Sequence, residues 1–148
     1  MADFFSDEYF MKQALIQAKE AFDKGEVPIG AVVVCNNSIV AKAHNLTESL
    51  NDVTAHAEML AITSAENNLG AKYLPSCTLY VTVEPCVMCA GASYWAQIGK
   101  IVYGASDNKR GYTQAGNNLL HPKTKVVTGI LAEECNKLIK DFFYSLRK

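Results

Sequence analysis

Two cysteines three residues apart, Cys86 and Cys89, follow directly after Pro85. Residues at positions i and i+3 of a helix share one face, so both sulfur atoms can point at one place. Pro85 is expected in the first turn of that helix, because its fixed φ suits a helix start. The partial positive charge at a helix N-terminus favours the thiolate, the form of cysteine that binds a metal. The spacing therefore predicts a pair of metal ligands.

Thirty residues before Cys86, His56 and Glu58 stand at the start of a second helical pattern. His56, Cys86 and Cys89 are three ligands of the kind that zinc takes, and zinc prefers four. A structural zinc takes its fourth ligand from the protein, whereas a catalytic zinc leaves that place to water. A carboxylate beside such a water can move its proton. Glu58 therefore favours a catalytic zinc, one per chain.

Each motif alone has other interpretations. A lone Cys-x-x-Cys is also typical of a redox pair or of half of a structural zinc site, and a lone His-x-Glu says little. Here both motifs stand at helix starts after strand-like runs, which favours the catalytic zinc. A fourth ligand from His44 or His121 would instead indicate a zinc-stabilised RNA-binding module without catalysis.

Length and composition predict a single domain over residues 1–148, large enough to bury roughly two thirds of its unfolded surface. The N-terminus lacks the basic region and apolar core of a signal peptide. No apolar run approaches the ~20 residues of a membrane span. The five cysteines are an odd number, and two are assigned to metal, so we expect a reduced, cytoplasmic protein. Cys35, Cys77 and Cys135 lie in apolar surroundings and are predicted to be small core residues.

The net charge of −1 predicts no nucleic-acid binding by itself, but the two halves differ. Residues 1–74 hold five Lys and Arg against ten Asp and Glu, which gives −5. Residues 75–148 hold nine against five, which gives +4. This asymmetry indicates a polyanionic partner for the second half, unless the lysines fell there by chance.

The elements that must position these residues alternate along the chain. Apolar periodicity and turn residues predict four helices and five strands. In chain order these are a helix capped by Ser6 and ended by Gly25, a hairpin of strands 31–35 and 38–43, a helix to about Asn68, strand 77–83, the Cys-x-x-Cys helix, strand 101–104, strand 125–128 and helix 131–146.

This order predicts an α/β fold, a mixed sheet with helices on both faces. Both metal segments then lie at helix N-termini beyond strand ends, where open α/β sheets place their sites. We expect Asp52 or Thr54 to cap the second helix, with His56 and Glu58 in its irregular first turn. Asn45 follows a strand and could read a substrate edge with its amide, or stabilise the turn.

Several cations and aromatic residues suit contacts with phosphates and bases. The long segment 105–123 carries Lys109, Arg110 and Tyr112, and loops of this length are usually functional. The tail ends in Arg147 and Lys148 beside three aromatic residues, of which Phe142 and Phe143 could equally be core. We expect RNA contacts from these cations and from Tyr112.

The chain also resembles a known group of enzymes. His56-Ala57-Glu58 with Pro85-Cys86-Val87-Met88-Cys89 is similar to the signature of zinc-dependent nucleobase deaminases. The segments 25–32, 54–59, 79–92 and 129–135 resemble more narrowly those of bacterial tRNA adenosine deaminases, which convert the wobble adenosine of an anticodon to inosine. The resemblance covers nearly the whole chain.

The resemblance implies a cytidine-deaminase-like, three-layer α/β/α fold with a five-stranded mixed sheet. It implies that His56, Cys86 and Cys89 bind zinc, that Glu58 shuttles the proton and that Asn45 binds the base. It also implies a homodimer whose RNA site uses both subunits, with a tRNA anticodon stem-loop as substrate. The segment 86–98 supports a homodimer, because it is apolar nearly all round and carries Tyr94 and Trp95 as interface anchors.

The chain departs from the family's pattern at Tyr112-Thr113-Gln114 and at Ser93-Tyr94-Trp95, where RNA contacts are expected. These departures affect substrate recognition rather than deamination. The alternative function is therefore a deaminase of the same fold that acts on guanine, cytosine or a free nucleoside.

Overall fold

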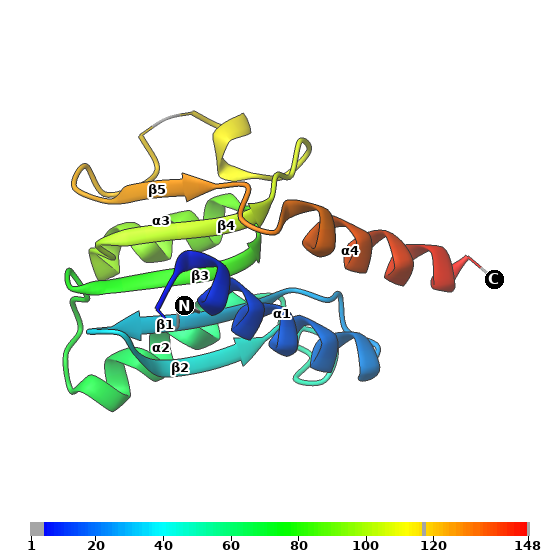
Figure 1. The fold of residues 1–148 in the computed structure, drawn as a ribbon, viewed down its shortest axis with the longest axis horizontal. Coiled ribbons are helices and arrows are strands. Elements are labelled where there is room, and N and C mark those ends of the chain that lie inside the picture. Colours follow the sequence, from blue (N-terminus) through cyan, green and yellow to red (C-terminus); the bar gives the residue numbers. More distant parts are fainter. Residues whose placement is uncertain (1–4, 117, 148) are drawn as a thin grey trace.

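Five strands form one sheet in the order β2-β1-β3-β4-β5 in a computed structural model, which describes residues 5–116 and 118–147 (Figure 1). Strand β1 pairs antiparallel with both β2 and β3, whereas β3, β4 and β5 run parallel. The five-stranded mixed sheet is therefore confirmed. The strands are β1 (Gly30–Cys35), β2 (Ser38–His44), β3 (Cys77–Val83), β4 (Lys100–Ala105) and β5 (Lys125–Thr128).

A two-residue turn joins β1 to β2, as the Asn-Asn dipeptide predicts. Asn36 and Asn37 have φ of 52° and 63°. Such left-handed pairs form the hairpin turns whose twist matches that of the strands, and asparagine tolerates this conformation well.

Four α-helices in the described residues cover the two faces of the sheet, which confirms the three-layer arrangement. Helices α2 and α3 share one core with the sheet, built around Val33, Leu79 and Ile101. On the other face, α1 and α4 pack against Val32 and Val102. The helices are α1 (Asp7–Asp23), α2 (Ala57–Leu69), α3 (Val87–Ala96) and α4 (Ala132–Leu146).

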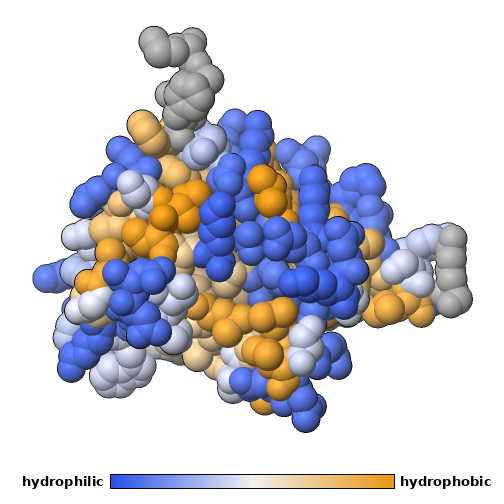
Figure 2. Space-filling view, turned by 90° about the horizontal axis from the view of Figure 1, so that it is seen from below, coloured by the Kyte–Doolittle hydropathy of each residue, from blue (hydrophilic) through white to orange (hydrophobic). Residues whose placement is uncertain are grey.

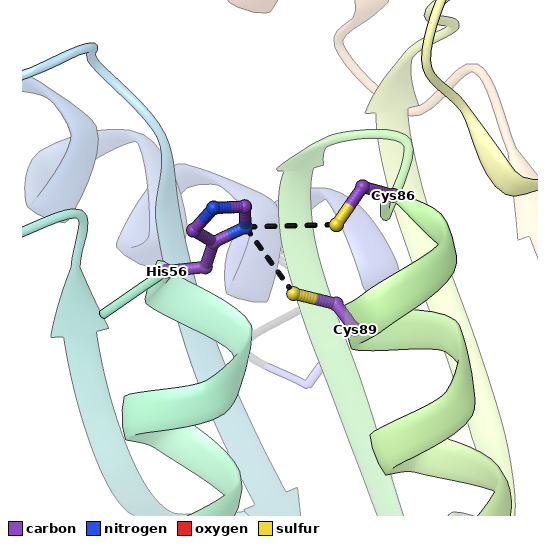
Figure 3. A group of neighbouring side chains, drawn as sticks. All are labelled: His56, Cys86 and Cys89. Atoms are coloured by element: carbon purple, nitrogen blue, oxygen red, sulfur yellow. Dashed lines mark hydrogen bonds between the residues drawn. The ribbon is translucent and has the colours of Figure 1, made fainter. Parts of the chain in front are cut away.

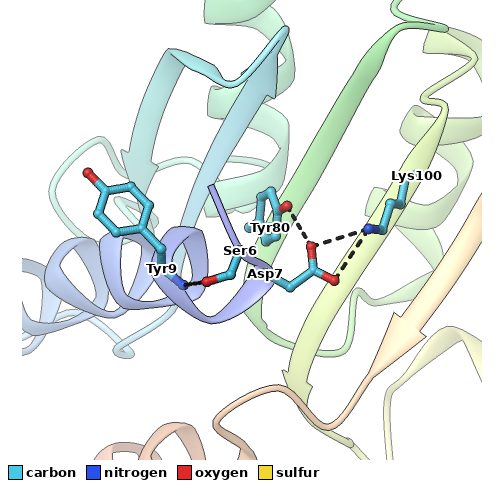
Figure 4. A network of polar contacts seen from close by, with 5 residues as sticks. All are labelled: Ser6, Asp7, Tyr9, Tyr80 and Lys100. Carbon is cyan, nitrogen blue, oxygen red and sulfur yellow. Dashed lines mark hydrogen bonds and ion pairs between the residues drawn. The ribbon is translucent and has the colours of Figure 1, made fainter. Parts of the chain in front are cut away.

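The start of α1 is fastened to the sheet by polar contacts (Figure 4). The Ser6 hydroxyl caps the helix by accepting the Tyr9 N–H at 3.1 Å. Asp7 accepts the Tyr80 hydroxyl at 2.8 Å and pairs with Lys100 at 3.2 Å. Burial, together with this carboxylate, raises the pKa of Tyr80, so its hydroxyl stays a donor.

Two helix starts differ from the prediction. Helix α2 is capped by His56, not by Asp52 or Thr54, since Asp52 instead accepts the N–H and hydroxyl of Thr54 within a turn that precedes the helix. Helix α3 begins at Val87 with Cys86 as its N-cap, so Pro85 stands just outside the first turn. Both shifts move a predicted metal ligand onto a helix cap.

Helix α4 projects beyond the sheet (Figure 1). Phe142 is buried, as expected for a core residue, whereas Phe143, Tyr144 and Leu146 are exposed. The space-filling view shows hydrophobic side chains near this end and in separate patches among hydrophilic ones (Figure 2). None of the helices in the described part of the chain is long and apolar enough to cross a lipid bilayer.

The contact between Tyr80 and Asp7 predicts a difference between two tyrosines. Tyr80→Phe keeps the buried ring but removes the hydroxyl that Asp7 accepts, so the free energy of unfolding should fall by about 1 kcal/mol. Tyr9→Phe is the matched control, because the ring of Tyr9 lies at the surface. Urea denaturation measures both, and equal stabilities for the two variants would contradict the role of this hydrogen bond.

Candidate active site

His56, Cys86 and Cys89 lie together, with their side chains pointing at one another across the space between α2 and α3 (Figure 3). The His56 Nδ1 atom lies 3.6 Å from the Cys86 sulfur and 3.5 Å from the Cys89 sulfur. Among the described residues, this is the group of histidine, cysteine and carboxylate side chains close enough to hold a metal ion. The three residues predicted as ligands therefore form a single cluster.

The fold brings the ligands together because two helices begin beside each other. His56 is the N-cap of α2 and Cys86 is the N-cap of α3, and both have extended backbone conformations. Cys89 lies one turn into α3, on the same side as Cys86. An N-cap side chain projects beyond the end of its helix, so both caps reach the space between the two helix starts.

The spacing of the three atoms fits a tetrahedral zinc ion. Zinc binds cysteine sulfur at about 2.3 Å and histidine nitrogen at about 2.0–2.1 Å, so a sulfur and a nitrogen on one tetrahedral ion lie about 3.6 Å apart. The observed separations match this value. Two thiolates and an imidazole are also a typical donor set for zinc. His44 and His121 do not belong to this group, so the described residues supply three ligands rather than four.

Hydrogen bonds within the cluster favour a thiolate at Cys86, which is the form of cysteine that binds a metal. The Cys89 thiol and His56 donate to Cys86, and these contacts lower the pKa of Cys86 to about 4 despite its partial burial. Hydrogen bonding to Cys86 raises the pKa of His56, and it raises the pKa of Cys89 together with burial. Cys86 is therefore the thiol of this cluster that loses its proton most readily, and a bound cation would displace the remaining protons.

Glu58 lies at this cluster in the first turn of α2, as predicted, and its side chain is buried. Burial raises the pKa of Glu58 to about 7, and the Cys89 sulfur lies close to its carboxylate. A carboxyl group that gains and loses its proton near neutral pH is suited to general acid–base work. Residues at positions i and i+2 of a regular helix diverge, but His56 precedes the helix proper, so both side chains reach one place.

Asn45 is buried at the end of β2, and its amide bonds to the backbone. Its oxygen accepts the Thr47 N–H at 3.3 Å, and its nitrogen donates to the Val27 carbonyl at 3.4 Å. These are the contacts of a residue that stabilises a turn. Both are long, and an amide has one more donor and one more acceptor position to offer.

The loop after Asn45 is held by Glu26, which sequence reasoning missed. Glu26 is 0% exposed and accepts the Glu48 N–H at 3.0 Å and the Ser49 N–H and hydroxyl at 2.6 Å. Burial by itself raises the pKa of a carboxyl group, but these donors outweigh burial and lower the pKa of Glu26. The side chain is thus a buried anion that fastens the loop.

A second buried carboxylate, Glu84, holds the segment 106–113 and was also missed. It accepts the Asp107 N–H at 3.1 Å and the N–H and hydroxyl of Thr113 at 3.1 and 2.7 Å. Gly111 passes so close to this carboxylate that a Cβ atom there would collide with it. Glu84 interrupts a largely apolar run from Leu79 to Met88, and this was the available signal, because a buried charge needs partners; Glu26 follows polar residues and gave no such signal.

The anchored segment presents its cations to solvent. Asp107 accepts the N–H groups of Lys109 and Arg110 at 3.0 Å, and both side chains are exposed. The predicted RNA contact from Tyr112 is wrong. Its side chain is only 6% exposed and packs against Tyr103, so the ring is not available to stack on a base. Arg147 is exposed at the end of α4, and Lys148 lies outside the described residues.

Helix α3 leaves part of its apolar surface uncovered within this chain. Trp95 is 76% exposed and Val87 is 51% exposed, although Ala90 and Ala96 are buried against the sheet. Tyr94 packs against Trp95 and His121. Ser93, which differs from the family's pattern, is buried, and its hydroxyl donates to the Ala90 carbonyl of the same helix.

Comparison with known proteins agrees with this geometry. The family described as MafB19-like deaminase matches residues 5–147. The chain is 49% identical over 147 residues to the tRNA-specific adenosine deaminase of Bacillus subtilis (strain 168), which covers 96% of this chain and 91% of that protein.

Two solved structures show the same fold. One comes from studies of A-to-I editing by tRNA:A34 deaminases at the wobble position of transfer RNA, with a TM-score of 0.83 and 41% identity over 88% of this chain and 98% of that chain. The other is guanine deaminase from Bacillus subtilis, with a TM-score of 0.67 and 41% identity over 75% of this chain and 70% of that chain. The chain therefore belongs to the MafB19-like deaminases and to the family of tRNA-specific adenosine deaminases.

Proposed function

We propose that this protein deaminates adenosine to inosine by hydrolysis at the wobble position of a tRNA anticodon. The observation that carries the proposal is the His56, Cys86 and Cys89 cluster with the buried carboxylate of Glu58 beside it, in a chain of this family. We further propose that residues 1–148 work as one catalytic domain in the cytoplasm, where tRNA is available.

A zinc ion is the metal that this donor set fits best. His56 Nδ1 and the sulfurs of Cys86 and Cys89 would hold it and leave one tetrahedral position for water. A zinc ion held in this way lowers the pKa of its water to about 7 and so supplies hydroxide near neutral pH. The starts of α2 and α3 favour the thiolates by their partial positive charges.

Glu58 does the proton work in this proposal. Its carboxylate takes the proton of the attacking water and delivers it to a ring nitrogen of the base. It then takes the second proton from the hydroxyl added to the carbon, which becomes the carbonyl, and gives it to the leaving amine. The raised pKa of Glu58, about 7, suits a group that must accept and release a proton in one cycle. Asn45 binds the edge of the base with the donor and acceptor positions that its turn leaves open.

The RNA contacts that we propose come from the cations on the segment held by Glu84. Lys109 and Arg110 project into solvent from a segment whose ends are fixed beside the cluster: the Tyr112 N–H donates to the Pro85 carbonyl at 2.9 Å, and Cys86 pairs with Gly111. Arg147 and Lys148 extend the set of cations. An anticodon base is already unpaired, so it costs little to extrude into a pocket.

A second candidate is the deamination of a free base such as guanine. The observation that favours it is the 41% identity to a guanine deaminase over three quarters of the chain. Both reactions use the same metal cluster and proton carrier, so the substrate is decided by groups outside the cluster.

The proposed roles predict that metal binding and turnover can be separated. Glu58→Ala, and Glu58→Gln as its isosteric partner, should keep one zinc per chain and lose activity by ~10²–10⁴-fold or more, because general acid–base catalysis is removed. His56→Ala should lose the metal as well as the activity. Elemental analysis and an inosine assay measure the two properties, and wild-type turnover in either Glu58 variant would contradict the proposed role.

The proposed substrate predicts inosine in an anticodon stem-loop and little ammonia from guanine, cytosine or free adenosine. Activity on RNA should fall steeply with salt, since phosphate contacts release counterions. Arg110→Ala should reduce the log–log salt slope by about one. Lys19→Ala, on the exposed face of α1, is the control and should leave the slope unchanged. Fast turnover of guanine with none on the stem-loop would favour the second candidate.

The uncovered surface of α3 predicts a homodimer. Exposed Trp95 and Val87 would bury apolar area against a second copy of the chain, and aromatic residues are typical interface anchors. Light scattering at micromolar concentration should give twice the mass of 16.2 kDa, and Trp95→Glu should shift it toward the monomer. A monomeric wild-type protein would contradict this proposal.

A further inference from the structure

Cys35 and Cys77 lie directly opposite each other at one end of the sheet. Cys35 is the last residue of β1 and Cys77 is the first residue of β3, and the antiparallel register pairs the two. Both pack against the core under α2 and α3, so their side chains lie on the same face of the sheet. Both are free thiols in the structure.

The backbone already meets the distance requirement for a disulfide bond. Directly opposed residues of an antiparallel pair have Cα atoms about 4.5–5.5 Å apart. Disulfides span Cα distances of about 4.4–6.8 Å. The register places the two side chains next to each other, and burial together with a hydrogen bond to Cys35 raises the pKa of Cys77 to about 12. The register therefore places the two residues within the range of Cα distances that a disulfide spans.

Cys35 is the thiol of the pair that solvent reaches, since Cys77 is only 3% exposed. Cys35 is half-buried at the strand end. Cys77 lines a cleft of about 610 Å³, whose walls also carry Lys100, Lys123 and Lys125. Lys123 and Lys125 are exposed, so the cleft offers positive charge to an anionic reagent. A small disulfide that carries carboxylates, such as oxidised glutathione, has the matching charge.

We propose that Cys35 and Cys77 form a reversible disulfide across β1 and β3 by exchange with an anionic low-molecular-mass disulfide. The Cys35 thiolate attacks one sulfur of the reagent, which forms a mixed disulfide and releases one reagent thiol. Cys77 then loses its proton and attacks the Cys35 sulfur, which releases the second reagent thiol. Two protein thiols are oxidised and one reagent disulfide is reduced to two thiols. Cys77 is the slower partner, because burial disfavours its thiolate.

The disulfide lies away from the candidate active site. Cys77 begins β3, whereas the strand's other end runs through Glu84 into the start of α3 and its metal ligands. The bond should therefore stabilise the fold without changing the chemistry. It would restrict the unfolded chain between positions 35 and 77, and a restricted unfolded chain favours the folded state.

The experiment incubates the zinc-loaded protein with graded ratios of oxidised to reduced glutathione and then blocks free thiols. Mass spectrometry of a non-reducing digest should find the peptides of Cys35 and Cys77 joined, and Tm should rise with the joined fraction. Zinc content and deaminase activity should stay unchanged, and dithiothreitol should reverse the rise in Tm.

Matched variants separate this pair from the other cysteines. Cys35→Ser and Cys77→Ala should each abolish the joined peptide and the rise in Tm. Cys135→Ala should retain both, because Cys135 is buried in the other core, under α4. A lasting glutathione adduct on Cys35 without closure would overturn the proposal. Thiol loss that comes only from Cys86 and Cys89, with release of zinc, would overturn it too.

Discussion

The candidate site depends on two helices that begin side by side at one edge of the sheet. His56 and Cys86 occupy the N-cap positions of α2 and α3, and neither side chain makes a capping hydrogen bond. Caps are usually serine, threonine, aspartate or asparagine, and the loss of such a cap costs about 1 kcal/mol. The helix starts thus lack this stabilising contact, and both side chains face the candidate metal site instead.

Two loops flank the starts of α2 and α3, and each is fixed in the same way, by a buried carboxylate that accepts three hydrogen bonds. Glu26 fastens the loop after Asn45, and Glu84 fastens the segment that carries Lys109 and Arg110. A buried carboxylate is costly unless it is satisfied, so each loop has a strong reason to stay in place. The rigidity of the site's surroundings therefore comes from backbone N–H groups and hydroxyls rather than from ion pairs.

The sequence predicted the fold and the grouping of His56, Cys86 and Cys89 well, because both rest on patterns with a direct physical cause. Alternating and helical periodicity predicted the strands and helices, and the spacing of Cys86 and Cys89 predicted their shared direction. The caps were predicted less well. Polar residues before α2 signalled a cap at Asp52 or Thr54, but these two bond to each other, which leaves the cap to His56.

The fate of individual loop residues could not be predicted from local sequence. Tyr112 lies in a polar segment beside two cations, which indicated an exposed base-stacking ring. Its N–H instead donates to the Pro85 carbonyl, and its ring packs against Tyr103 and is buried. Glu26 and Glu84 escaped notice because a lone glutamate gives no periodic signal. Their importance follows from partners that lie 22 to 29 residues away in the chain.

The ends and the tip of the segment 106–113 differ in how many contacts they make, and this affects which positions can change. Its ends are held by Glu84, Pro85 and Cys86, whereas its tip of Asn108, Lys109 and Arg110 has exposed side chains. Mutations at the tip can accumulate without loosening the anchor or disturbing the metal ligands. The surface that this segment presents to a partner can therefore change in charge while the backbone that carries it stays in place.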